Sequence, residues 1–116
     1  MQAGYFLRIM GAANPWQQAA EEQYVFYLQR ERHLFAWCLV EYDGMSRDSA
    51  VREAQIFYRY EAVDDARRGQ LFHDSAWHWA MLHVVGEQYW KRRPELAHES
   101  ERFREEADSF SVRQTA

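Results

Sequence analysis

The sequence predicts an all-α fold, a compact bundle of four to five helices. Apolar residues recur at helical spacing along most of the chain. Residues that begin or end helices, Asn14-Pro15, Asp43-Gly44 and Pro94, separate the periodic segments. No Asn-Gly or similar hairpin turn joins two apolar runs. These observations together favour helices over strands.

Length and composition indicate one domain. The chain has 116 residues, of which 47% are hydrophobic and 28% charged, an ordinary composition for a globular protein. A chain of this size can bury a core without disulfides or metal. We expect a single helical domain over residues 1–110 and a frayed tail over residues 111–116.

The first helices are predicted around Asn14-Pro15. An apolar stripe at i, i+3, i+4 and i+7 precedes this pair and comprises Phe6, Ile9, Met10 and Ala13. Asn14 then suits an N-cap and Pro15 the first position of a helix that continues to about Tyr42. Within that helix, the polar run 29–32 is expected to face solvent.

Later helices follow from similar signals. Gly44 is predicted as a left-handed C-cap and Ser46 as the N-cap of the next helix, followed by a connector over residues 63–69. Asp74 or Ser75 caps a segment that is apolar nearly all round, so we expect a buried central helix near residues 75–92. Glycine within it, Gly86, indicates that another backbone passes close by.

The last helix is predicted to open at Pro94. A narrow apolar stripe, Leu96, Phe103, Ala107 and Phe110, is set among charged residues, so this helix should dock by one edge. The alternative to the all-α fold is α+β. Its candidate strands, residues 24–28, 35–40 and 56–60, are rich in residues that favour strands.

Charge and cysteine content exclude several classes of protein. The net charge of −4, from 14 basic and 18 acidic side chains, argues against a binder of nucleic acid. Charged residues interrupt every apolar stretch before it could span a membrane, and the N-terminus lacks a signal-peptide pattern. The lone cysteine, Cys38, lies in an apolar run and is expected to be structural. We therefore expect a cytoplasmic protein.

Motifs of catalysis are missing, and metal-like spacings are sparse. The chain has no His-Glu-x-x-His, no Cys-x-x-Cys, no phosphate loop and no nucleophile elbow, so an enzyme and a cofactor are not expected. His83 and Glu87 are four residues apart and would share one helix face, whereas the spacing of five between His78 and His83 spreads these two around a helix. Glu95 and His98 have the spacing of di-iron ligands, but that site needs the motif twice.

Aromatic residues are abundant, with 5 Trp, 7 Tyr and 7 Phe. They can fill the core, or they can serve as anchors for a partner, because Trp and Tyr dominate binding hot spots. The candidates for exposed anchors lie near helix ends or off the main stripe: Tyr5, Trp16, Trp37, Tyr60, Tyr89 and Trp90.

Two functions fit these features. The first is a protein–protein interaction module, such as an adaptor, an immunity-type or antitoxin-type inhibitor or a small chaperone, with a second copy or another protein as the partner. The alternative is a small-molecule or metal site between helices, formed by His78, His83 and Glu87. It requires these three side chains to converge in one pocket.

Overall fold

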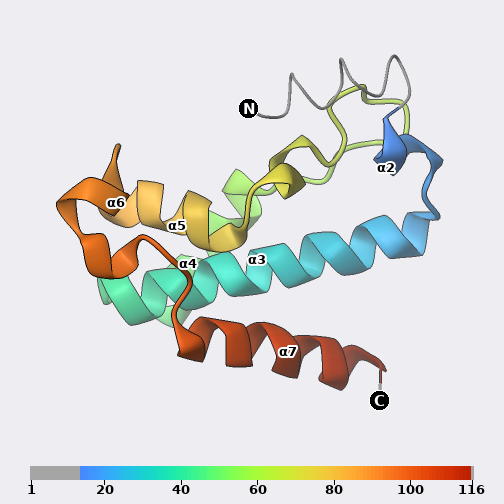
Figure 1. Ribbon diagram of the computed structural model, residues 1–116. Coiled ribbons are helices and arrows are strands. Elements are labelled where there is room, and N and C mark those ends of the chain that lie inside the picture. Colours follow the sequence, from blue (N-terminus) through green and yellow to red (C-terminus); the bar gives the residue numbers. More distant parts are fainter. Residues whose placement is uncertain (1–13, 116) are drawn as a thin grey trace.

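Helices and short helical turns make up the regular structure of residues 14–115, the part of the chain that the computed structural model describes (Figure 1). The helices are α2 Pro15–Gln18, α3 Glu21–Asp43, α4 Arg47–Phe57, α5 Ala76–Val84, α6 Tyr89–Arg92 and α7 Glu101–Thr115, with 3-10 turns η1 Gln70–His73 and η2 Pro94–Leu96. These residues contain no strand, which confirms the all-α prediction and excludes the α+β alternative for them. The helix predicted around Phe6–Ala13 and the candidate anchor Tyr5 lie outside the described residues.

The central element of the bundle is α3, a helix of 23 residues and about 34 Å. In Figure 1 it runs through the middle of the molecule, with α5 along one side, α7 along the other and α4 behind it. Its buried side chains accordingly lie on more than one face: Tyr24, Leu28, Glu31, Leu34, Phe35, Ala36, Cys38 and Leu39. The prediction that residues 75–92 form the central helix is therefore corrected.

Residues 75–92 are two helices and not one. The first, α5, ends at Val84, and the chain turns through Gly86 with φ of +113° and Gln88 with φ of +58° before α6 begins. A positive φ is easy for glycine, so Gly86 serves to turn the chain beyond α5, and the atom nearest to a Cβ built on it belongs to the side chain of Arg92 rather than to a neighbouring backbone. The side of α5 that faces the core is formed by Ala76, Trp77, Ala80 and Met81.

Local capping signals were predicted correctly. The Asn14 side chain accepts a hydrogen bond from the Trp16 backbone N–H, and Gly44 adopts φ of +70° at the C-cap of α3. The hydroxyls of Ser46 and Ser75 accept hydrogen bonds from backbone N–H groups in the first turns of α4 and α5. Each cap satisfies a donor that the helix itself leaves unpaired.

The helix predicted from Pro15 to Tyr42 is interrupted after four residues. Ala19 and Ala20 have ψ of 156° and 145°, which is extended backbone, so α2 ends at Gln18 and α3 begins at Glu21. Alanine is a strong helix former, so its own propensity does not cause this break. The tertiary contacts of Trp16, described below, hold α2 in a different direction.

The last helix begins later and ends later than predicted. Leu96 belongs to η2, and α7 starts at Glu101 and extends to Thr115. The predicted apolar stripe is buried as expected, since Phe103, Ala107 and Phe110 all lie against the core. Because the rest of α7 up to Ser111 is half-buried or exposed, the helix docks by one edge.

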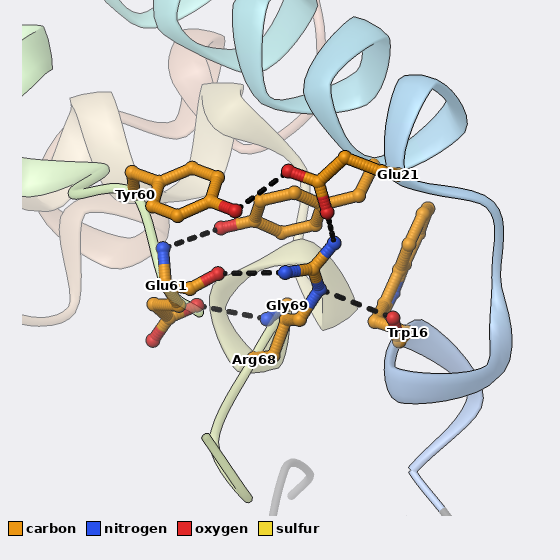
Figure 2. Close-up of polar contacts among 7 residues, drawn as sticks. Trp16, Glu21, Tyr60, Glu61, Arg68 and Gly69 are labelled. Atoms are coloured by element: carbon orange, nitrogen blue, oxygen red, sulfur yellow. Dashed lines mark hydrogen bonds and ion pairs between the residues drawn. The ribbon is translucent and has the colours of Figure 1, made fainter. Parts of the chain in front are cut away.

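A buried arginine joins the connector between α4 and α5 to the start of α3 (Figure 2). The side chain of Arg68 is fully buried. Its Nη2 donates to Glu21 Oε1 at 2.6 Å, its Nη1 to the Glu61 carbonyl at 2.9 Å and its Nε to the Trp16 carbonyl at 3.1 Å. The guanidinium carbon also lies 3.8 Å from the centre of the Tyr24 ring. We call these five residues the Arg68 hub.

The indole of Trp16 packs directly against Gly69, which follows Arg68 in the chain. Gly69 has φ of +75°, and a Cβ atom built on it would lie 2.2 Å from Trp16 Cδ1. The indole is held in place by Tyr24, Tyr27 and Phe72, whose ring centres lie 5.2 to 6.2 Å away. Only glycine at residue 69 leaves space for this indole.

A Gly69→Ala substitution should destabilise the protein by about 3 kcal/mol, because the positive φ and the clash with Trp16 add together. Gly44→Ala is the matched control, since Gly44 has a similar φ of +70° and nothing within 4 Å of its added Cβ. It should cost only about 1 kcal/mol. Urea denaturation followed by circular dichroism measures both, and equal losses would contradict the steric role of Trp16.

Candidate functional site

A groove of about 520 Å³ lies between α3, α4 and α7. We call it the Trp37 groove. Its lining comprises Gln29, Arg32, His33, Ala36, Trp37, Val40 and Glu41 of α3, Arg47, Val51, Ala54 and Gln55 of α4, and Glu106 of α7. The α3 residues recur at three- and four-residue intervals, so they form one helix face. From Gln29 to Glu41 this face is about 18 Å long.

The floor of the Trp37 groove is apolar. The half-buried Trp37 and Val40 of α3 face the partly exposed Val51 of α4. Two buried alanines, Ala36 and Ala54, let α3 and α4 approach closely at this point. The floor is thus open to solvent although it is built from core-type side chains.

The rim of the groove is polar, and its two sides differ. On the α7 side the carboxylates are already paired: Glu41 Oε1 lies 3.1 Å from Arg102 Nη2, and Glu106 Oε2 lies 2.5 Å from His33 Nε2. These two contacts bridge α3 and α7.

The α4 side of the rim carries arginines. The Nε of Arg32 donates to the Tyr58 carbonyl at 2.8 Å, which ties α3 to the end of α4. At the other end of α4, Arg47 is exposed and lines the groove. One wall therefore presents positive charge, while the carboxylates of the opposite wall are offset by their partners.

The predicted interaction anchors have different fates. Trp37 lines the groove, and Trp90 and Tyr60 are 43% and 52% exposed. Trp16 is enclosed by other rings and is not an exposed anchor. The prediction that Tyr89 is an exposed anchor is wrong, because only 4% of this residue is accessible. Its hydroxyl lies 2.9 Å from His78 Nδ1.

The three predicted metal ligands are not brought together. His83 is exposed on α5, while Glu87 lies beyond the end of that helix, so the shared helix face no longer exists. The Nδ1 of His78 is engaged with the Tyr89 hydroxyl. Across the described residues, no group of three His, Cys, Asp or Glu side chains is placed to hold a metal ion.

Most of the aromatic residues fill the core. Phe35 stacks on Phe57 with ring centres 5.0 Å apart, and Trp77 meets Tyr42 and Phe103 edge-on at 5.3 and 5.4 Å. Among the described aromatic residues, only Tyr60 and Trp90 are largely exposed. The many aromatic side chains in the composition are thus mainly packed inside the protein.

Glu31 is a buried acid that sequence reasoning missed. It was expected in solvent as part of the run 29–32, yet only 4% of it is accessible. Arg30 Nη1 donates to its Oε2 at 2.7 Å. Burial raises the pKa of the Glu31 carboxyl to about 7, although the Arg30 charge opposes this rise. Its position in the helix could have predicted this burial. Leu28, Leu34 and Phe35 lie three or four residues from Glu31 and form one buried stripe with it.

Glu31 lines a second cavity, of about 430 Å³, on another face of α3. We call it the Glu31 cavity. It is bounded by α3, by the junction of η1 and α5, and by α7 together with Glu99 just before it. Arg32 and His33, the two residues that follow Glu31, line the Trp37 groove instead. Successive residues of one helix therefore serve two different sites.

The raised pKa of Glu31 predicts a pH-dependent stability. Between about pH 4.5 and pH 7 the unfolded chain loses this proton while the folded chain retains it, so stability falls as pH rises. The loss should reach about 3 kcal/mol at pH 8. Denaturation of the wild type and of Glu31→Gln at pH 5 and pH 8 isolates this contribution. The stability of the variant minus that of the wild type should be larger at pH 8 than at pH 5. An equal difference at the two pH values would contradict the prediction.

Comparisons with known proteins give no match for this chain, whether with protein-family models, with curated proteins or with solved structures. A separate finding concerns membranes: no helix within residues 14–115 combines the length and the apolar character needed to cross one. Function must therefore be derived from the groove and the cavity themselves.

Proposed function

We propose that the protein is a protein–protein interaction module that binds an amphipathic helix of another protein in the Trp37 groove. The observation that carries the proposal is the composition of the groove, an open apolar floor of Trp37, Val40 and Val51 inside a polar rim. Interfaces between proteins share this anatomy of apolar centre and polar border. Tryptophan is also among the residues that contribute most to binding energy.

The dimensions support a helix as the occupant. The groove follows α3 for about 18 Å, which matches about three turns of a second helix. Such a helix would place apolar residues at i, i+3 or i+4 and i+7 on the floor, as in other helix-in-groove complexes. It would pack against α3 between α4 and α7 as a further member of the bundle.

The charges on the rim of the Trp37 groove favour a partner helix with acidic residues. The two acids of the rim, Glu41 of α3 and Glu106 of α7, already have partners, whereas the α4 wall presents the exposed Arg47. A partner helix with acidic residues along the flank that faces α4 would complement this wall. Complementary charge mainly adds specificity and speed of association.

The proposal can be tested with a displayed library of helical peptides that carry Leu or Ile at the floor positions and Glu on one flank. Wild-type protein is the bait. Val51→Glu places a carboxylate on the apolar floor at a residue that is 39% exposed, so the fold should be kept. Selected peptides should bind this variant at least about tenfold more weakly, which is about 1.4 kcal/mol, by fluorescence anisotropy.

Ile56→Glu is the matched control, since Ile56 is also on α4, is 66% exposed and does not line the groove. It should bind the selected peptides as the wild type does. Peptides that bind all three proteins equally, or a library from which nothing is enriched, would refute the groove as a binding site for helices.

A second copy of this chain is the other candidate occupant, as the sequence suggested. Light scattering distinguishes it, because the chain has a mass of 14.0 kDa and a dimer has twice that. A dimer that Val51→Glu dissociates and Ile56→Glu does not would assign the groove to self-association. The cytoplasmic location and the class of partner, whether an adaptor target, a toxin or a chaperone client, stay predictions.

A further inference from the structure

The Glu31 cavity has the size of a small-molecule site and a charged group set into its wall. Its volume of about 430 Å³ lies within the range typical of pockets for small ligands. Glu31 lines it although only 4% of the residue is accessible. A buried carboxyl group is unfavourable unless it meets a donor or a cation. Placed in a cavity, such a group is a candidate for ligand recognition.

Donors within the protein use only part of the acceptor capacity of Glu31. Arg30 Nη1 donates to Oε2, and the backbone N–H of Ala76, at the start of α5, also acts on the carboxylate. A carboxylate can accept about four hydrogen bonds. The group can therefore accept further donors from a ligand in the cavity.

The remaining charges of the cavity favour a cation. Its lining holds four carboxylates, Glu31, Asp74, Glu99 and Asp108, against the two guanidinium groups of Arg30 and Arg104. Both guanidiniums are engaged, Arg30 with Glu31 and Arg104 with the Glu99 carbonyl at 2.7 Å. With Glu31 ionised, the lining carries an excess of two negative charges.

A buried tyrosine packs against one residue of the cavity lining. Tyr58 is 1% exposed, and its hydroxyl has no hydrogen-bond partner among the described residues. Burial, and next the charge of Glu31, raise the pKa of Tyr58, and Tyr27 and Asp74 of the cavity lining act on it as well. Tyr58 does not itself line the cavity, but its ring stacks with that of Phe72, a lining residue, with ring centres 6.3 Å apart. Buried polar groups in proteins are rarely left without a partner.

We propose that the Glu31 cavity binds a small organic cation, an ammonium or amidinium group on an aromatic or aliphatic body, with Glu31 as its counterion. The body of the ligand would lie against Phe72 and Phe103, which also line the cavity. This site is separate from the Trp37 groove and does not depend on the function proposed for it.

The test uses four probes on the full-length, isotope-labelled protein, followed by NMR titration of the backbone amides. Two probes are cations, 2-phenylethylamine and benzamidine, and two are matched controls, the neutral 2-phenylethanol and the anionic phenylacetate. The cations should give saturable shifts around Glu31 and the start of α5 at concentrations below about 10 mM, as expected for ligands of this size. The neutral and anionic probes should not.

Variants identify the counterion. Glu31→Gln should weaken the binding of both cations at least about tenfold. Glu105→Gln, a matched change at an exposed residue of α7 outside the cavity lining, should leave binding unchanged. The proposal is overturned if neither cation saturates, if 2-phenylethanol binds as tightly as the amine, or if the Glu31→Gln variant retains the affinity.

The pH dependence gives a readout on the unmodified protein. Because the Glu31 carboxyl ionises around pH 7, the affinity of the wild type for benzamidine should increase from pH 6 to pH 8. The other charged groups of the lining are Arg30 on α3, Asp74 before α5, Glu99 before α7, and Arg104 and Asp108 on α7. Glu31→Gln retains all of them, so a pH dependence that survives in this variant would assign the effect to another group.

Discussion

The connector between α4 and α5 depends on one buried cation. Residues 58–75 contain little regular structure besides η1, so their position is set by side chains more than by a backbone ladder. Arg68 supplies the central contact, with three hydrogen bonds and a ring face around a single guanidinium. A buried charge of this kind is stable only because it is paired and fully bonded. Without it, α2 and the connector would lose their common attachment to α3.

The Arg68 hub also explains why α2 departs from the direction of α3. The Trp16 carbonyl accepts a hydrogen bond from Arg68, while its indole occupies the space left by Gly69. The Asn14 amide donates to the carbonyls of Ala66 and Arg68. These contacts fix α2 at both its backbone and its side chains, so they outweigh the helix propensity of Ala19 and Ala20.

Helix caps and the all-α class followed from sequence because they depend on neighbours along the chain. Asn14, Gly44, Ser46 and Ser75 act through hydrogen bonds or backbone angles within a few residues. The central helix was misplaced for the opposite reason. Apolar character all round suggested residues 75–92, but the number of neighbours around α3 is a property of the assembled bundle.

The candidate sites were less predictable than the helices. Among the predicted anchors, Trp37 reaches the groove because three helices meet around it, and no local pattern reports such a meeting. Glu31 was assigned to solvent by its charge, although its spacing from Leu28 and Phe35 placed it on the buried stripe. The histidines failed as metal ligands because the chain turns at Gly86 and separates Glu87 from α5.

The attachment of α2 has a consequence for the order of folding. The contacts between α3 and α4 join segments separated by a short turn, so they need little loop closure. The hydrogen bonds that Asn14 donates to Ala66 and Arg68, and that Arg68 donates to Trp16, instead join residues 52 to 54 positions apart. Closing a loop of that length carries an entropic cost that local contacts do not meet. The hairpin of α3 and α4 can therefore form early, whereas the hub closes only after much of the chain has collapsed.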